Sequence, residues 1–147
     1  MRITAVAFAA GLLLGPGIVL AESHQPVVTV HKSPTCGCCG NWAEHMRDNG
    51  FTVVEKDTEG MPQVKALAGV PGDLASCHTA VVDGYIIEGH VPAADVRRLL
   101  NEAPDAAGLA VPGMPPSSPG MDVPGYDTPY ETLLFTDDGQ TKVFSRH

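Results

Sequence analysis

Basic residues are scarce in this chain. Among its 147 residues, 9 are lysine or arginine and 17 are aspartate or glutamate, which gives a formal net charge of −8. Nucleic acids and anionic membrane surfaces are themselves negative and would repel such a protein. The composition therefore argues against nucleic acid as a partner, whereas cationic metals would be mildly attracted.

The chain also lacks an uninterrupted hydrophobic run that is long enough to favour a membrane span. Residues 3–20 are mostly apolar, but this run lies at the short end of the roughly 20 residues that a span needs, and glycine and proline interrupt it at Gly11, Gly15, Pro16 and Gly17. Arg2 precedes the run, and Val19-Leu20-Ala21 ends it with the small or apolar residues that signal peptidase prefers. We predict a secretory signal peptide over residues 1–21, periplasmic localisation, and no stable membrane insertion after cleavage.

Cysteine is rare as well, with four residues in the whole chain. A mature chain over residues 22–147 is a typical single domain whose core folds without covalent links, so the cysteines are available for a functional site. Three of the four lie within four positions, at Cys36, Cys38 and Cys39, and Cys77 is a distant fourth.

Disulfides are the first alternative to weigh, because exported thiols meet an oxidising compartment. Cys38 and Cys39 are adjacent and can pair only through a strained vicinal bond, and a bridge from Cys36 to Cys38 or Cys39 closes a very small ring, which we expect to be far from relaxed bridge geometry. A metal that binds all four thiolates avoids this difficulty. Structural disulfides remain the alternative interpretation.

Hydrophobic periodicity and turn residues predict the element order βαβαββα. The expected strands cover residues 27–31, 51–57, 79–83 and 85–88, and the expected helices cover 39–49, 61–68 and 92–101. A turn at Asp83-Gly84 joins the last two strands. This order is that of the thioredoxin fold, so we predict an α/β, thioredoxin-like core over about residues 26–103.

The composition changes after this core. Residues 104–129 are rich in proline, glycine and serine and predict a long loop, and residues 131–136 and 141–146 flank turn residues and predict a β-hairpin. So long a loop is unusual in a compact domain and is often functional, for instance as a lid. It contains Met114 and Met121 in near-copies of one phrase, Pro-Gly-Met-Pro and Pro-Gly-Met-Asp.

The position of the cysteines in this predicted fold favours a thiolate cluster. At a helix N-terminus, the partial positive charge lowers thiol pKa values, which we expect for Cys36, Cys38 and Cys39. In the thioredoxin topology, the loop before the third strand faces this helix end, and here it carries Ser76, Cys77 and His78. Thioredoxins usually have a cis-proline in this loop. Since this chain has none there, Cys77 can complete a four-sulfur cage.

Soft thiolate ligands select Cu(I), zinc or an iron–sulfur cluster. Adjacent thiolates can bridge metals, which favours a polynuclear Cu(I) cluster. Zinc, usually enclosed by C-x₂₋₄-C pairs, is the second choice, and the spacing matches neither ferredoxin pattern. Copper is therefore the predicted metal.

Four further residues are candidates for the metal site. Met114 and Met121 carry thioethers, which bind Cu(I) but are also ordinary apolar packing groups. His78 follows Cys77, although in a strand its side chain would point away from its neighbour's. Cleavage after Ala21 would place a free amine two residues before His24, which together can form a square-planar Cu(II) site.

The remaining histidines and the tryptophan receive plainer interpretations. Trp42 is expected to pack beside the site and limit solvent. His31 and His45 are interpreted as polar surface residues. No sequence argument assigns a role to His90 or His147.

Together these motifs resemble a known family. Ser33-Pro34-Thr35-Cys36-Gly37-Cys38-Cys39, the lone Cys77, the stretch from Gly108 to Met114, and Ser118-Pro119-Gly120-Met121 are similar to the CopG-like family of predicted periplasmic metal-binding proteins, which is associated with bacterial copper resistance. The resemblance implies a thioredoxin-like fold, copper bound by the clustered cysteines, and interconversion of Cu(I) and Cu(II).

Three functions follow as hypotheses. In the first, the four cysteines act through bound copper in an oxidoreductase that passes electrons to an acceptor. In the second, the protein sequesters Cu(I), or delivers it to other periplasmic copper-handling proteins, without turnover. In the third, Cys36 and Cys39 alone perform thiol–disulfide exchange, which leaves Cys38 and Cys77 unexplained.

Overall fold

The computed structural model describes residues 25–147, so the predicted signal peptide and His24 lie outside the described residues. The described chain is a mixed α/β structure with a seven-stranded sheet and three α-helices. Its first seven strands and helices follow the predicted order, which is confirmed. They are β1 (Val27–Lys32), α1 (Gly37–Asp48), β2 (Thr52–Asp57), α2 (Met61–Leu67), β3 (Thr79–Val82), β4 (Tyr85–Glu88) and α3 (Ala93–Glu102).

The strand order in the sheet is β2-β1-β3-β4-β5-β6-β7. β1 runs parallel to β2, and β3 is antiparallel to both of its neighbours, β1 and β4. The predicted turn at Asp83-Gly84 is present, with φ values of 46° and 85° that suit a two-residue hairpin. This turn pairs Val82 with Tyr85 and Thr79 with Glu88.

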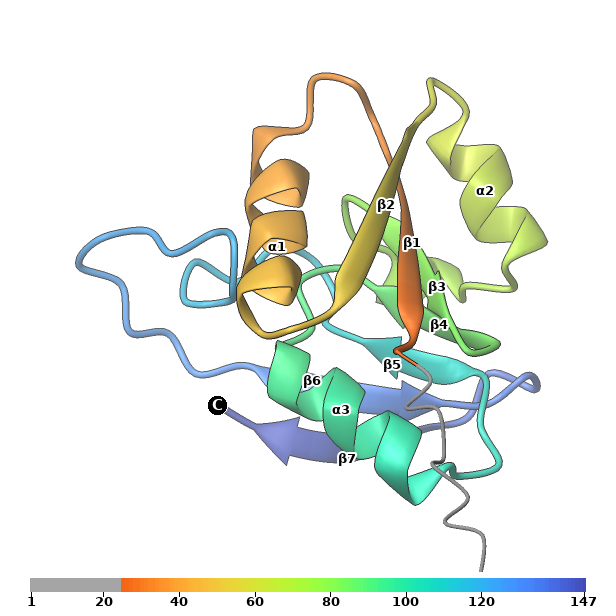
Figure 1. Cartoon of the computed structure of the whole chain (residues 1–147). Coiled ribbons are helices and arrows are strands. Elements are labelled where there is room, and N and C mark those ends of the chain that lie inside the picture. Colours follow the sequence, from red (N-terminus) through yellow and green to blue (C-terminus); the bar gives the residue numbers. More distant parts are fainter. Residues whose placement is uncertain (1–24) are drawn as a thin grey trace, which may run out of the picture.

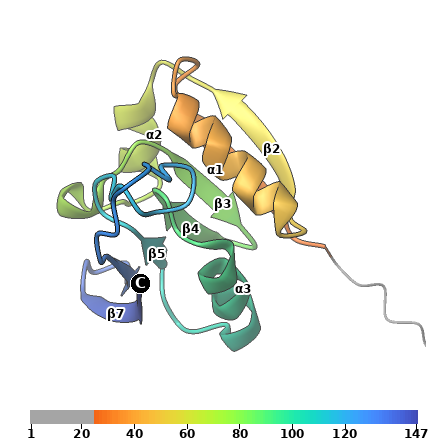
Figure 2. The same cartoon turned by 90° about the vertical axis from the view of Figure 1, so that its left-hand side faces the viewer.

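Helices cover both faces of the sheet (Figures 1 and 2). α1 and α3 lie on one face, where Trp42, Met46, Val96 and Leu99 are buried in the main core together with strand residues such as Val30 and Ile87. α2 and the 3₁₀ turn η1 (Gly72–Leu74) lie on the other face, where Leu74, Ala110 and Phe135 form a smaller core cluster. The prediction did not include η1.

The predicted loop over 104–129 is wrong at one end, because β5 (Gly108–Ala110) lies within it. β5 pairs parallel with β4 and antiparallel with β6. A Cβ atom on Gly108 would lie 1.8 Å from the Ile86 carbonyl oxygen, so only glycine allows this close approach. A three-residue strand among prolines and glycines has no detectable period, which explains why it was missed.

The predicted C-terminal hairpin is confirmed as β6 (Glu131–Phe135) and β7 (Thr141–Arg146), and it extends the central sheet. Asp95 of α3 anchors it. The buried Asp95 carboxylate accepts hydrogen bonds from Thr132 Oγ1 at 2.6 Å and Ser145 Oγ at 2.8 Å, and it lies 2.9 Å from His147 Nε2. The hairpin is therefore tied to the main core through α3.

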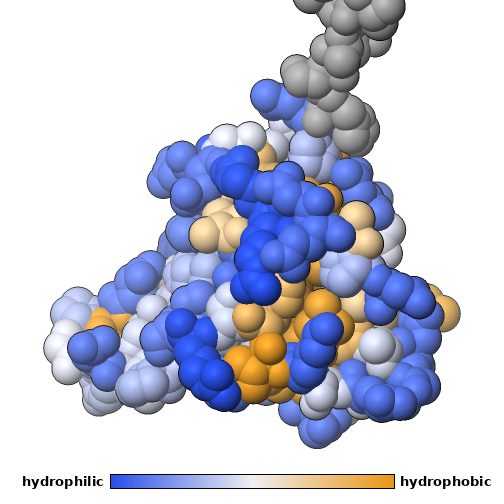
Figure 3. Space-filling model, turned by 90° about the horizontal axis from the view of Figure 1, so that it is seen from below, coloured by the Kyte–Doolittle hydropathy of each residue, from blue (hydrophilic) through white to orange (hydrophobic). Residues whose placement is uncertain are grey.

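Residues 111–130 form the remaining loop, which passes close to α1 on its way from β5 to β6 (Figures 1 and 2). Viewed from below, most of the surface is hydrophilic, with a smaller hydrophobic area between the polar residues (Figure 3). Within residues 25–147, none of the helices has the length and apolarity needed to cross a membrane.

Candidate metal centre

The first turn of α1 presents three cysteines at one point. Cys36 is the N-cap residue and has extended backbone angles, and its amide donates to the Ser33 carbonyl oxygen at 3.0 Å. No side chain caps this helix, so the Cys36 sulfur is not used for capping. Cys38 and Cys39 follow inside the first turn, because α1 starts at Gly37, two residues before the predicted helix start. Cys39 is fully buried, and Cys36 and Cys38 are half-buried.

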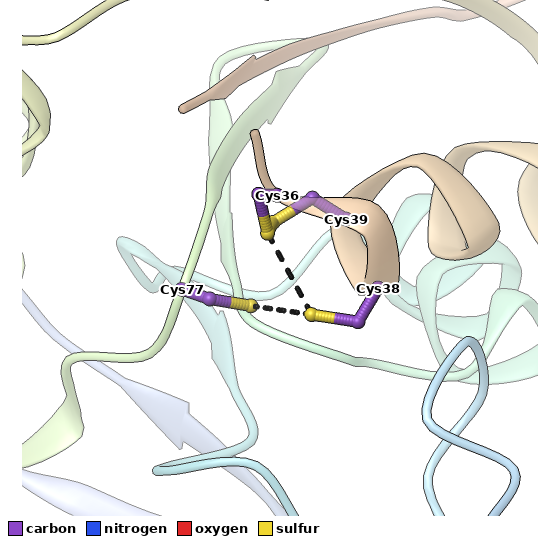
Figure 4. A group of neighbouring side chains, drawn as sticks. All are labelled: Cys36, Cys38, Cys39 and Cys77. Atoms are coloured by element: carbon purple, nitrogen blue, oxygen red, sulfur yellow. Dashed lines mark hydrogen bonds between the residues drawn. A yellow bond between two sulfur atoms is a disulfide. The ribbon is translucent and has the colours of Figure 1, made fainter. Parts of the chain in front are cut away.

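Cys77 approaches this turn from the loop before β3, as predicted (Figure 4). The Cys38 sulfur lies 3.6 Å from the Cys36 sulfur and 4.0 Å from the Cys77 sulfur. All four cysteine sulfur atoms lie within 4.8 Å of one another. The four predicted site cysteines are therefore gathered into one cluster.

Cys36 and Cys39 form a disulfide. The sequence analysis expected poor geometry for so small a ring, but the first helical turn brings the two Cα atoms to 5.4 Å, a separation within the normal range for disulfides. Cys38 and Cys77 remain free thiols. A metal bound by all four thiolates thus requires that the bridge first be reduced.

Glu88 of β4 holds the Cys77 loop in place. Its fully buried carboxylate accepts hydrogen bonds from the Ser76 amide at 2.7 Å and from Thr79 Oγ1 at 2.6 Å. Lys65 of α2 forms an ion pair with it at 2.5 Å. These donors satisfy a charge that would otherwise be costly to bury, and they fix the backbone on both sides of Cys77.

The Cys77 thiol is electrostatically unlike a cysteine at a helix N-terminus. Burial, followed by the neighbouring Cys38, raises the pKa of Cys77 to about 11. The metal-free thiol is therefore protonated at neutral pH, and a metal that binds there must displace the proton.

His90, which the sequence analysis left without a role, contacts Cys77 directly. Its Nε2 lies 3.0 Å from the Cys77 sulfur, and its Nδ1 lies 2.8 Å from the Pro119 carbonyl oxygen. This contact could have been predicted from the Asp83-Gly84 turn, which fixes the register of the β3–β4 hairpin. The register pairs Thr79 with Glu88, and two positions further along it places residue 77 opposite residue 90.

His78 also belongs to the site, contrary to the argument that its side chain would point away from that of Cys77. That argument assumed a strand, but β3 begins only at Thr79. His78 Nδ1 lies 3.5 Å from the Cys77 sulfur, and the ring, which is fully buried, packs 4.5 Å from that of Trp42. Burial lowers the pKa of His78 well below its usual value and also lowers the pKa of His90.

Trp42 packs beside the site, as predicted. It is fully buried, and its indole N–H donates to the Val91 carbonyl oxygen at 2.8 Å. Its ring packs against that of His78, with 4.5 Å between the ring centroids.

The two Pro-Gly-Met phrases lie against the two cysteine-bearing segments. The Gly113 carbonyl oxygen accepts a hydrogen bond from Ser76 Oγ, next to Cys77. Gly120 packs on α1, where an added Cβ atom would lie 2.6 Å from the Trp42 amide nitrogen and 3.0 Å from the Cys38 carbonyl oxygen. The following residues differ in burial: Met114 is 53% exposed and Met121 is half-buried.

Fold and site together define a class, a mixed α/β protein with a cluster of four cysteines suited to soft metals. Residues 74–121 match the family described as "Protein of unknown function, DUF411". This segment spans Cys77, His78 and His90 and ends at Met121. A search of curated proteins finds no match.

Two solved structures of the copper resistance protein CopG are similar to this chain. Form 2 shares 42% sequence identity with a TM-score of 0.80, and the match covers 84% of this chain and 99% of that chain. Form 1 shares 43% identity with a TM-score of 0.78, covering 82% of this chain and 96% of that chain. The chain therefore belongs to the CopG family of copper resistance proteins.

Proposed function

We propose that this protein binds copper as Cu(I) in a thiolate cluster formed by Cys36, Cys38, Cys39 and Cys77. The observation that carries the proposal is the convergence of all four sulfur atoms within 4.8 Å. Thiolates are soft ligands that prefer Cu(I). The relatives described as copper resistance proteins point to the same metal, and zinc is the second choice.

The arrangement of the sulfurs favours more than one copper ion. Cys38 lies between Cys36 and Cys77, at 3.6 Å and 4.0 Å from their sulfurs, which is where a bridging thiolate would be needed. A single tetrahedral ion would instead need four ligands that radiate from one point. We therefore propose a polynuclear Cu(I) cluster.

We further propose that the bound copper changes oxidation state as part of copper resistance. In this step each Cu(I) ion loses one electron to a one-electron acceptor, which is a redox protein or dioxygen, and dioxygen would become superoxide. The resulting Cu(II) ion binds thiolates less well than Cu(I) and is released more readily. The four cysteines serve the redox step through the metal.

Other parts of the molecule also have roles in the proposed function. We propose that residues 22–147 are a single periplasmic domain released from the signal peptide, and that β1–α3 is its thioredoxin-like core. The 111–130 loop acts as a lid, because its residues Gly113, Pro119 and Gly120 contact both cysteine-bearing segments. Met114 and Met121 are the additional sulfur ligands that this lid offers.

Thiol–disulfide exchange is the second candidate function, and one observation favours it. Cys36 and Cys39 have the C-x-x-C spacing of redox sites and form a disulfide. Exchange would use only these two residues. Replacement of Cys38 or Cys77 by serine would then leave activity unchanged, whereas copper binding would be weakened by either change.

The experiment that separates these functions loads the reduced mature chain with Cu(I) without oxygen, counts bound copper and free thiols, and then admits air while the Cu(II) EPR signal is recorded. A Cys36→Ser/Cys38→Ser/Cys39→Ser variant is the control. Several thiol-bound ions that become EPR-active reversibly support the redox function. Stable, EPR-silent copper would indicate sequestration, and copper no greater than in the control would contradict both copper functions.

A further inference from the structure

Two imidazole groups approach the same Cys77 sulfur that closes the cysteine cluster. His90 Nε2 lies 3.0 Å and His78 Nδ1 lies 3.5 Å from it. One ligand atom from each of these three residues lies within 4.8 Å of the other two. One sulfur and two nitrogens thus lie close together, and this sulfur is also a member of the four-cysteine cluster.

The hydrogen bonding of His90 leaves the correct nitrogen available to a metal. The Pro119 carbonyl oxygen can only accept, so the His90 Nδ1 atom at 2.8 Å must carry the proton and donate it. In a neutral imidazole, Nε2 then has a free lone pair, and this atom is the one beside Cys77. Metal-ligating histidines generally have this arrangement, in which the second nitrogen donates to a backbone carbonyl or carboxylate.

His78 is costly to keep unless it has a function. It is fully buried, and its Nε2 atom lacks a hydrogen-bond partner within residues 25–147. Burial of an unpaired polar group destabilises a fold, so such a group in a native structure calls for an explanation. An apolar side chain would fill the space beside Trp42 without that cost, so a function that needs an imidazole accounts for His78, and its Nδ1 atom, which lies 3.5 Å from the Cys77 sulfur, is the one placed to bind a metal.

We propose that Cys77, His78 and His90 form a second metal site, which takes a divalent ion of borderline softness, Cu(II) in this protein. The two imidazoles and one thiolate are the ligand set of copper sites that transfer electrons. Binding converts the Cys77 thiol to a thiolate and releases its proton. The identity of the ion as copper rests on the proposed function, whereas the ligand set does not.

The two sites share Cys77, which gives the second site a role in oxidation. A Cu(I) ion held by Cys77 in the cysteine cluster meets nitrogen ligands as soon as it loses its electron to the acceptor. Because imidazole suits Cu(II) and thiolates suit Cu(I), the ion can change ligands without leaving Cys77. The lid contributes through Pro119, whose carbonyl oxygen orients His90.

The test removes the cysteine cluster and retains the second site. In the mature chain, Cys36→Ser, Cys38→Ser and Cys39→Ala leave Cys77 as the single cysteine, and His24→Ala removes the candidate amino-terminal Cu(II) site. Co(II) is the probe, because it does not oxidise thiols and gives a strong absorption band when a thiolate binds it. We expect one Co(II) ion per chain with a thiolate-to-Co(II) charge-transfer band.

His90→Gln in this background should weaken Co(II) binding at least about tenfold. Loss of a group that only hydrogen-bonds to a metal ligand already costs about tenfold or more in affinity, and loss of a ligand itself should cost no less. His31→Gln is the matched control, because His31 lies on β1 outside the cluster and should leave binding unchanged. A charge-transfer band that is absent, or that is equally strong in the His90→Gln protein, would overturn the proposal.

A second measurement avoids any folding defect caused by His90→Gln. Proton NMR of the Co(II)-loaded protein with both histidines present should show strongly shifted N–H resonances that disappear in D₂O, one from the His90 Nδ1 proton and one from the His78 Nε2 proton. The absence of such resonances would also contradict the proposal.

The proposed function is judged separately, by Cu(I) loading of the chain that keeps all four cysteines. If that chain binds Cu(I) while the variant binds no Co(II), the second site is wrong and the copper function stands. If that chain binds no Cu(I) while the variant binds Co(II), the copper function fails and the second metal site stands.

Discussion

Gly120 shows how closely the 111–130 loop, the proposed lid, approaches the cysteine-bearing turn of α1. Its φ of 85° lies in the left-handed region, and a Cβ atom would lie 2.6 Å from the Trp42 amide nitrogen. The near-copy Gly113 also has a positive φ, of 68°, but a Cβ atom there would meet no atom within 4 Å. The chain thus supplies a matched pair of glycines that differ mainly in steric contact.

We predict that Gly113→Ala lowers the free energy of unfolding by about 1–2 kcal/mol, the cost of left-handed backbone strain. Gly120→Ala should cost at least about 1 kcal/mol more, because it adds an overpacking term, and should also weaken Cu(I) binding by displacing the lid. Urea unfolding and competition for Cu(I) against a chromophoric chelator measure the two effects. Equal effects of the two substitutions would show that the lid does not depend on this contact.

His45 is a structural residue, although the sequence analysis interpreted it as a polar surface group. It is half-buried on α1, and its Nε2 accepts a hydrogen bond from the Ala93 amide at the start of α3 at 3.1 Å. Burial lowers the pKa of His45 below 6.5, although the carboxylates of Asp122 and Asp48 oppose this shift. Protonation would both charge the ring and remove the acceptor for Ala93.

The stability of the protein should therefore decrease on acidification. Because the folded pKa of His45 is lower than the unfolded value, the unfolded chain binds more protons below about pH 6.5, and stability is lost as the pH falls through the folded pKa. His45→Gln keeps an acceptor for Ala93 and should reduce the slope of unfolding free energy by up to about 1.4 kcal/mol per pH unit. Urea unfolding of the metal-free protein between pH 7 and 5 measures this slope, and a slope that His45→Gln leaves unchanged would refute the assignment.

At the residue scale, the sequence predicted that the four cysteines lie together, as the structure shows, but gave no role to His90. Spacing alone identifies Cys36, Cys38 and Cys39, because they are local in the chain. His90 lies thirteen residues from Cys77 and reaches it only through the β3–β4 register. That register was implicit in the Asp83-Gly84 turn, so the contact was predictable from pairing although not from any motif.

At the scale of elements, the Glu88 network determines where the Cys77 loop lies. Lys65 from α2, Thr79 from β3 and the Ser76 amide all donate to one fully buried carboxylate. Because Glu88 is two residues before His90 on the same chain segment, the network also fixes the backbone that carries this imidazole. Three elements thus position two groups of the candidate site.

Glu88→Gln should destabilise the protein by roughly 3 kcal/mol. Removal of one partner from a buried ion pair costs about 3–5 kcal/mol, and the lower end applies because the Lys65 side chain retains 16% exposure. Urea unfolding of the reduced protein measures the loss. Glu102→Gln is the control, since it removes an exposed pair with Arg98 and should cost less than about 1 kcal/mol. Similar losses for both variants would contradict the importance of the Glu88 network.

Some helices and strands could be predicted from the sequence and one strand could not, and the difference has a physical reason. Helices and strands of the core were predicted to within about two residues, because periodicity and the turn at Asp83-Gly84 mark them. β5 was missed because its three residues are defined by the close approach of Gly108 to Ile86, a tertiary contact that leaves no local pattern.

At the scale of the whole molecule, the Cys36–Cys39 disulfide and four-cysteine copper binding exclude one another. The disulfide withholds two of the four sulfurs and leaves Cys38 and Cys77 as free thiols. Under the proposed function, redox state would therefore control how much copper the protein holds.

We predict that the oxidised protein binds fewer Cu(I) ions than the reduced protein. The difference is measured by titrating the protein with Cu(I) before and after treatment with a thiol-free reductant. The reductant is removed before Cu(I) is added. In a Cys36→Ser/Cys39→Ser variant the reductant should have no effect on binding. An oxidised wild-type protein that binds as many ions as the reduced form would show that Cys36 and Cys39 are not copper ligands.

The central claim is that the four cysteines hold Cu(I) as a thiolate cluster, and X-ray absorption of the reduced, Cu(I)-loaded protein tests it most directly. We predict copper surrounded mainly by sulfur, with a second-shell copper neighbour that reports a polynuclear cluster, and loss of both signals in the Cys36→Ser/Cys38→Ser/Cys39→Ser variant. A first shell composed mainly of nitrogen or oxygen, or a spectrum that this variant leaves unchanged, would contradict the claim.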